Sequence, residues 1–481
     1  MNFCRDTAVR IPTPGRILVH NLNRIAIGKT FSSSPIPNPQ SPIPIYNYYY
    51  YYLRDSGAGF LNMLKNHKST YLLAAALIAF GWTTADNACA GERRYKQQKT
   101  ASFTSTLGNK QMVEGLYTQD LEAASYFQQG VTRYNRQDFR GAELALRKSL
   151  EFDPSIAMAY YLLGNSLAQQ GQFERATNEY LQAIRLNPNL GEAYYNLGVA
   201  LYRQGQPDAA LAAYQRALAF NPNLADGYYN VGLALEAKGQ SEEAIAAYRQ
   251  ALVKEPNYAQ AHYNLGLLLV KQNQPEAALT EFQEAVRINP NYAEAQYQLG
   301  LLYTQQNQQQ RAVNAFKTAA DRNPELADAQ YQMGVIFAQQ GNFKAAANRF
   351  QEAVRLNPND AESYQQLGAM LLKRNQVKEA TTALTEAKRL KPNDATIEYN
   401  LGVALQRQGQ LAQAIAAYQQ AIVIDPSLAD AFYNLGVSLQ QTGRREEAIP
   451  FLIQAKSLFN QQGNVDKIDQ LNQFLQQIGA N

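Results

Sequence analysis

The sequence GEAYYNLGVALYRQGQPDAALAAYQRALAFNPNL occupies residues 191–224 and predicts two short helices joined by a turn. Leu197 and Leu201 lie four residues apart, which places them on one face of the first helix. Gly205 suits the left-handed turn that ends a helix, and Pro207 stands at the favoured first position of the next one. Each helix is marginally stable alone in water, so the pair must bury its apolar faces against neighbours.

The same unit recurs along most of the chain. Glycine appears ten times at a constant step of 34 residues, from Gly130 to Gly436, and its small size lets a second helix come close. Alanine stands 12 residues after each glycine, and proline closes nine of the ten units. A fixed period of this length indicates a stacked repeat architecture. The units are 123–156, 157–190, 191–224, 225–258, 259–292, 293–326, 327–360, 361–394, 395–428 and 429–462.

Glycine at position 8 of each unit, alanine at 20, an aromatic residue or leucine at 24 and proline at 32 resemble the tetratricopeptide repeat (TPR) family. The resemblance covers residues 123–462. It implies an all-α fold, in which antiparallel helix pairs stack into an α-solenoid with a right-handed superhelical path and an inner groove. The Tyr-Asn-Leu-Gly stretches are similar to the repeats of O-linked N-acetylglucosamine transferases. No catalytic domain like theirs is seen here, so that activity is not carried over.

Residues 463–481 predict a helix that caps the end of the repeats. Val465, Ile468, Leu471 and Leu475 make one apolar face, and a polar outer face keeps the end of such an array soluble. In the last unit, Pro450 is expected to loosen or kink the second helix.

The distribution of rare residues argues against an enzyme. After residue 90 the chain has no Cys, no Trp and a single His, His262. This excludes cysteine nucleophiles, disulfides and histidine metal clusters from the repeats. We therefore expect no catalytic residues, no cofactor and no metal site. His262 is interpreted as a packed, half-buried side chain.

The positive net charge belongs to the front of the chain. Residues 1–90 hold 8 Lys and Arg against 3 Asp and Glu, whereas the remainder holds 36 against 37. The repeats are therefore nearly neutral, and their basic residues form no stripe interleaved with aromatic ones. Nucleic acid is not an expected partner.

Two ladders recur on the first helix of each unit, which in this family faces the inner groove. Tyrosine holds the fifth position in eight of the ten units, with Phe127 and Gln365 in the other two. Amide side chains, which both donate and accept hydrogen bonds, hold the sixth position in nine units, and Leu162 interrupts them. One interpretation is that the ladders bind an extended peptide; the other is that they hold neighbouring units together. The candidate peptide-binding residues are Tyr161, Tyr195, Tyr229, Tyr263, Tyr297, Tyr331, Tyr399, Tyr433, Asn196, Asn230, Asn264, Gln298, Gln332, Gln366, Asn400 and Asn434.

The second position of the unit is often acidic. Such a row favours protein or peptide ligands that are neutral or basic rather than acidic. The family's clamp for chaperone C-terminal carboxylates needs basic residues at positions 2, 5 and 6, and none stands there. Asn165 matches its ninth position, but Tyr161 occupies the fifth. The acidic residues are Glu192, Asp226, Glu294, Asp328, Glu362 and Asp430.

Residues 63–90 read as a secretory signal peptide. Basic residues precede an apolar run of about 12 residues, too short to span a bilayer, and the segment ends in Ala88-Cys89-Ala90. Cleavage between Ala90 and Gly91 would leave 91–122 as a polar linker. We expect export to a bacterial periplasm or beyond, with a mature chain that does not span the membrane. The alternatives are a thylakoid lumen or an anchor formed by the uncleaved signal.

Residues 1–62 are rich in proline and tyrosine and are expected to be disordered. Two explanations remain open. Either the true start is Met63, or the segment is the first part of a two-part organelle address. Sequencing of the native N-terminus distinguishes them, since residues upstream of Met63 exist only in the second case.

The sequence as a whole predicts a non-enzymatic scaffold or adaptor for protein–protein interaction and complex assembly. The alternative is a non-catalytic targeting or regulatory subunit of an enzyme complex. A single enzyme that co-purifies in a fixed ratio would favour the subunit, and many weakly held clients would favour the scaffold.

Overall fold

The computed structural model of the chain describes residues 118 and 120–479, and these form helices and turns only. The predicted signal peptide, its cleavage site and the disordered leader lie outside the described residues and stay predictions. The described chain divides into two bodies, which we call the first body (up to Pro256) and the second body (from Asn257).

Both bodies are built from consecutive helix pairs. The first body contains α4 Leu121–Asn135, α5 Phe139–Phe152, α6 Ala157–Gln169, α7 Phe173–Leu186, α8 Gly191–Arg203, α9 Pro207–Phe220, α10 Ala225–Ala237 and α11 Ser241–Lys254. The second body contains α12 Ala259–Lys271, α13 Pro275–Ile288, α14 Ala293–Gln305, α15 Gln309–Arg322, α16 Ala327–Gln339, α17 Phe343–Leu356, α18 Ala361–Lys373, α19 Val377–Leu390, α20 Ala395–Arg407, α21 Leu411–Ile424, α22 Ala429–Gln441, α23 Arg445–Gln461 and α24 Val465–Gln477. The predicted all-α solenoid of helix pairs is confirmed.

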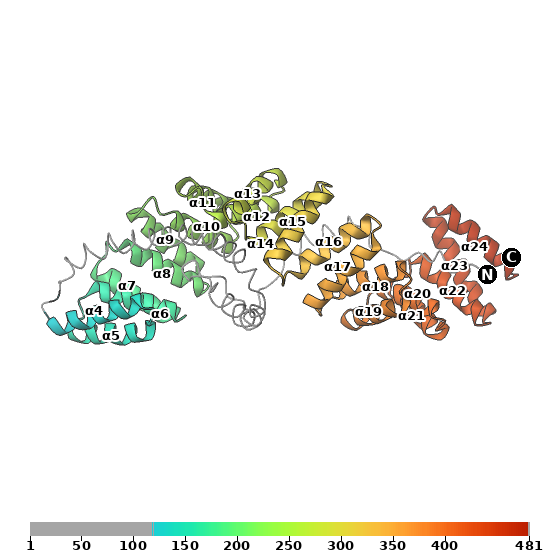
Figure 1. Ribbon diagram of the computed structural model, residues 1–481, viewed down its shortest axis with the longest axis horizontal. Helices are drawn as coiled ribbons and strands as arrows, with labels where there is room; N and C mark the ends of the chain where they lie inside the picture. The colour runs from blue at the N-terminus through green and yellow to red at the C-terminus, as the bar shows by residue number, and fades with distance from the viewer. Residues whose placement is uncertain (1–117, 119, 480–481) are drawn as a thin grey trace, which may run out of the picture. The chain divides into compact units, whose positions relative to one another are not determined.

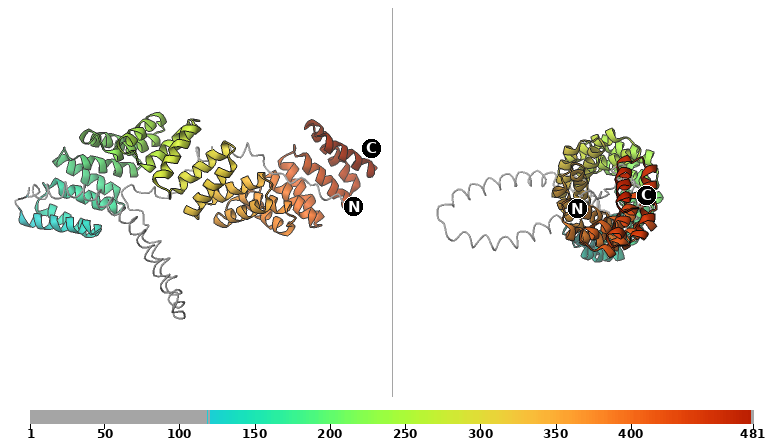
Figure 2. Two further views of the ribbon diagram at one scale, coloured as in Figure 1. Left: turned by 45° about the horizontal axis from the view of Figure 1, so that its top comes forward. Right: turned by 90° about the vertical axis from the view of Figure 1, so that its right-hand side faces the viewer.

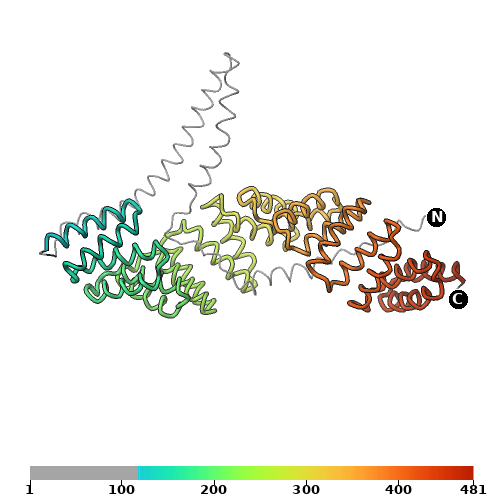
Figure 3. The backbone as a smooth tube through the Cα atoms, turned by 90° about the horizontal axis from the view of Figure 1, so that it is seen from below, coloured from blue at the N-terminus to red at the C-terminus, as the bar shows by residue number. Residues whose placement is uncertain are grey.

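Within each body the helices stack in chain order, each packed against the next (Figures 1, 2 and 3). The first helices of consecutive repeats also contact each other, as α4 does α6 and α6 does α8 in the first body. Contacts between consecutive second helices are weaker. The first helices therefore lie on the inner side of each stack, where the family resemblance placed them.

Each pair turns at a residue with left-handed backbone, as the sequence predicted for position 15 of the unit. The φ angle is 72° at Gly205, and the same conformation occurs at the non-glycine residues Gln137, Asn273, Asn307 and Asn375. Because a side chain is disfavoured there, glycine or asparagine fills nine of the ten turns and Gln137 carries the strain.

The core of each pair depends on two small residues. A Cβ added at Gly198 would lie 2.6 Å from the ring of Tyr214, so glycine at position 8 is what lets the second helix come close. Ala210, at position 20, is fully buried in the same pair. The expected close approach is thereby confirmed.

At the far end of the second body, α24 covers the last repeat with Leu471 and Leu475, which are buried. The helix α23 runs without interruption through Pro450. The proline is the sixth of the 17 residues in this helix.

Candidate binding face on the first helices

We define the binding face as positions 2, 5, 6 and 9 of the first helices. At position 5, seven of the eight tyrosine rings pack against the aromatic residue at position 24 of their own repeat. The eighth, Tyr433, has Leu452 there and packs against Phe474 of α24. The ring centroids of the seven pairs lie 5.5–6.2 Å apart in tilted or edge-on arrangements, which aromatic pairs prefer. The pairs are Tyr161–Tyr180, Tyr195–Tyr214, Tyr229–Tyr248, Tyr263–Phe282, Tyr297–Phe316, Tyr331–Phe350 and Tyr399–Tyr418. The rings thus belong to the core of each repeat.

At position 6, Asn196, Asn230 and Asn434 each donate a hydrogen bond to the tyrosine hydroxyl of the preceding repeat. Asn196 Nδ2 lies 3.2 Å from the Tyr161 hydroxyl, and Asn230 Nδ2 lies 2.9 Å from that of Tyr195. The pair Asn434–Tyr399 repeats the arrangement in the second body at 3.3 Å. We call this contact the inter-repeat lock.

Burial differs along the two ladders. Tyr399 and Asn400 are fully buried, and only Tyr161, Tyr263, Tyr433 and Asn264 are half-buried. The other members are buried, namely Tyr195, Tyr229, Tyr297, Tyr331, Asn196, Asn230, Gln298, Gln332, Gln366 and Asn434. The contacts therefore show that the ladders join neighbouring repeats, and a direct role in peptide binding stays a prediction.

The acidic row at position 2 lies next to the same hydroxyls. The Tyr331 hydroxyl donates to Glu362 Oε1 at 3.1 Å, and Asp430 pairs with Lys467 of the capping helix. Burial raises the pKa of Tyr195 well above its ordinary value, and the nearby charge of Asp226 adds to the effect. The hydroxyl thus stays protonated at neutral pH, where it can both accept and donate.

Sequence reasoning missed a second contact between repeats, made by glutamine at position 14. Gln204 Nε2 donates to the Phe173 carbonyl at 3.2 Å and to Thr177 Oγ1 at 2.7 Å. Gln408 reaches the Val377 carbonyl at 3.2 Å in the same way. The signal was present, because glutamine holds this position in six of the ten units.

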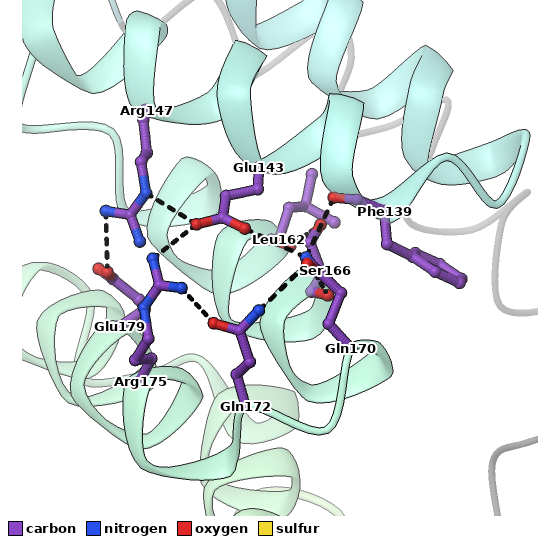
Figure 4. Close-up of polar contacts among 9 residues, drawn as sticks. All are labelled: Phe139, Glu143, Arg147, Leu162, Ser166, Gln170, Gln172, Arg175 and Glu179. Atoms are coloured by element: carbon purple, nitrogen blue, oxygen red, sulfur yellow. Dashed lines mark hydrogen bonds and ion pairs between the residues drawn. The ribbon is translucent and has the colours of Figure 1, made fainter.

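Figure 4 shows the most elaborate of these junctions, between the first and second repeats. Gln170 Nε2 bonds the Phe139 carbonyl and Glu143 Oε2, while Glu143 Oε1 pairs with Arg175 at 2.6 Å and with Arg147 at 3.2 Å. Burial alone would raise the pKa of Glu143, but hydrogen bonds from Gln170 and the two arginines outweigh it and hold that pKa below its ordinary value. The carboxylate therefore remains charged and ties α5 to α7.

Other chemistry is sparse in the described part of the chain. His262, as interpreted from sequence, is largely covered, and its Nδ1 lies 2.6 Å from Glu281 Oε2. The described residues bring together no group of three metal-ligating side chains. None of their helices has the length and apolar character needed to cross a membrane.

Family comparisons agree with the repeat pattern. Models described as tetratricopeptide or TPR repeats match residues 164–205, 191–224, 229–293, 297–361, 331–395, 407–443 and 429–462. Two of these ranges, 191–224 and 429–462, have the bounds of units expected from sequence. No curated protein matches the chain.

Solved structures resemble parts of the chain. A MamA protein is 29% identical over 36% of this chain and 94% of its own, with a TM-score of 0.34. YrrB, described as a TPR protein with an unusual peptide-binding site, is 29% identical over 38% and 95%, with a TM-score of 0.35. The pilF protein of Pseudomonas aeruginosa is 23% identical over 44% and 96%, with a TM-score of 0.39.

Proposed function

The chain belongs to the tetratricopeptide repeat family, and on this premise we propose that it is a non-enzymatic scaffold that binds extended segments of partner proteins along its first helices. The segments are neutral to basic. In the alternative function, the chain is a non-catalytic subunit of an enzyme complex and binds its partner through the same face. The two functions differ in the ratio of partner to chain, which is fixed for a subunit.

The row of acids at position 2 is the observation that supports this proposal best. Glu192 and Glu362 are half-buried on the first-helix side, and Glu294 is exposed there. The inter-repeat lock leaves the neighbouring side chains little freedom, so the carboxylates are presented by a rigid surface. A rigid surface reduces the entropy that binding must overcome, and a row of acids attracts N–H donors and cationic side chains.

The lock also changes which groups are offered to a ligand. The Nδ2 atoms of Asn196 and Asn230 already donate within the protein. Their carbonyl oxygens are the remaining hydrogen-bonding groups, and these accept from a peptide N–H or a basic side chain. The amide carbonyls and the row of acids therefore both favour a ligand rich in hydrogen-bond donors.

A selection of phage-displayed random peptides on the purified full chain tests the proposal. We expect enrichment of peptides with Lys or Arg and depletion of acidic ones. The variant Glu192→Gln/Glu294→Gln should bind the selected peptides roughly 1.5- to 5-fold more weakly for each acid that they contact, as expected for an exposed charge pair. Fluorescence anisotropy of labelled peptides measures the affinities.

Glu174→Gln is the matched control, because Glu174 is an exposed acid on the second helix α7, away from the binding face. Its affinity should equal that of the unaltered chain. If no peptide is enriched, or if all three proteins bind equally, the proposed function is wrong.

A further inference from the structure

A small pocket opens among α4, α6, α7 and α8 in the first body. Its volume is about 30 Å³, and the residues that line it include Tyr134, Asn165, Gln169 and Tyr180. Space of this size holds about two or three water-sized groups. None of the lining residues carries a charge.

The pocket owes its polarity to Asn165, at position 9 of the second repeat. The other nine repeats have Val, Leu or Ala at this position, beginning with Val131 and Val199. Asn165 is nine-tenths buried. Its Oδ1 accepts two hydrogen bonds, one from the Tyr180 hydroxyl and one from Asn196 Nδ2, each at 2.8 Å. The oxygen therefore helps to join the second repeat to the third.

The amide nitrogen is the part of Asn165 that stacking does not use. Within α6, one of its N–H groups interacts with the Tyr161 hydroxyl. The second N–H makes no bond among the described residues, and neither do the Tyr134 hydroxyl or the Gln169 side chain. A donor, a hydroxyl and an amide thus line the same small, uncharged space. They complement a neutral group that both accepts and donates hydrogen bonds.

A primary carboxamide meets these requirements. Its carbonyl accepts from Asn165 Nδ2, the two N–H groups of its NH2 donate to Gln169 Oε1 and to the Tyr134 hydroxyl, and its three heavy atoms suit the available volume. A carboxylate has no donor to offer, and burying its charge without a cationic partner is costly. An aliphatic group would leave all three polar groups unpaired.

We propose that this pocket, which we call the carboxamide pocket, binds the side chain of a Gln or Asn in the partner segment. The inference rests on the proposed function, since it assigns one position of the bound peptide. It makes the second repeat a point of specificity, since the other nine repeats have an apolar residue at position 9.

The probe for the test is propionamide, which carries the end of a glutamine side chain. It is titrated into the full chain labelled with ¹⁵N-asparagine, and the side-chain NH2 resonance of Asn165 is followed by NMR. We expect a saturable shift with propionamide and none with propionate. Tyr134→Phe should weaken binding by about two- to tenfold, the effect of one hydrogen bond.

Tyr126→Phe is the matched control, because Tyr126 lies on the same helix and stacks on Phe152, outside the pocket. It should leave the affinity unchanged. Asn196 also lines the pocket, and its side-chain NH2 resonance should shift with propionamide as well. Asn165→Val, which introduces the residue used at this position in the third repeat, should abolish that shift. Its folding is checked by circular dichroism, and Tyr134→Phe decides the matter if that variant unfolds.

Equal shifts with propionate, no shift with propionamide, or an unchanged affinity in Tyr134→Phe would overturn the proposal. Selected peptides without enriched Gln or Asn, together with a silent propionamide titration, would remove the pocket and leave the proposed function standing. A propionamide shift without any selected peptide would contradict the proposed function and leave the pocket standing as a binding site for a carboxamide.

Discussion

At the scale of single residues, one hydrogen bond recurs across the repeats and explains why the ladders are so regular. The hydroxyl of Tyr195 accepts from Asn230 of the next repeat, and both side chains are buried. A buried polar group left without its partner is costly. The pair is therefore useful to stability whether or not a ligand ever reaches it.

We predict that Asn230→Ala destabilises the first body by about 1–3 kcal/mol, because it leaves the buried Tyr195 hydroxyl without its donor. Urea unfolding followed by circular dichroism measures the change. After Tyr195→Phe, the same substitution should cost less by about 1 kcal/mol, since the partner is already gone. Strictly additive effects would show that the two side chains do not depend on each other.

At the scale of helices, α4, the first helix of the first body, differs from the first helices of the later repeats. Position 7 holds an apolar, buried residue in nine repeats, such as Leu163 and Leu197, but Gln129 in α4 is exposed. Position 3 is also buried in the other nine repeats, as at Ala159, whereas Ser125 in α4 is exposed. The outer face of α4 is thus polar, as a terminal repeat requires for solubility.

We predict that Ser125→Ala/Gln129→Leu turns this face into an adhesive surface. The two substitutions restore the residues on which a preceding second helix would pack, so copies of the chain should associate through α4. Sedimentation velocity should show a concentration-dependent dimer. Gln310→Leu, an exposed site along the side of the stack, should remain at the mass of the unaltered chain. Equal behaviour of both variants would contradict this role for α4.

At the scale of the whole molecule, the buried tyrosines give the protein a common sensitivity to alkali. Burial raises the pKa of Tyr180, Tyr195, Tyr214 and Tyr297 above the ordinary value of 10, because it disfavours the charged form. An unfolded chain ionises its tyrosines at that ordinary value. The contribution of these neutral side chains to folding is therefore complete below about pH 10 and is lost as the pH rises toward the raised values.

We predict that helicity falls cooperatively above about pH 10, together with the appearance of tyrosinate absorbance from the buried rings. An alkaline titration followed by circular dichroism and ultraviolet absorbance checks both signals. Replacing Tyr180 and Tyr214 with Phe should move the helical transition to higher pH, since two of the ionisable groups are removed. Ionisation of all tyrosines near the ordinary pKa with helicity retained would contradict the prediction.

Local sequence is sufficient to specify the helix pairs, their turns and their register. These depend on local chemistry repeated at a fixed step, including the left-handed residue of each turn, the small residue at Gly198 and the proline that closes a unit. The hydrogen bonds between side chains of neighbouring repeats, by contrast, follow from the packed three-dimensional arrangement. Residues 31 to 35 positions apart meet in Gln204–Phe173 and Asn196–Tyr161, and periodicity alone does not say which atoms bond. The two hydrogen bonds that the buried amide oxygen of Asn165 accepts follow from that packing.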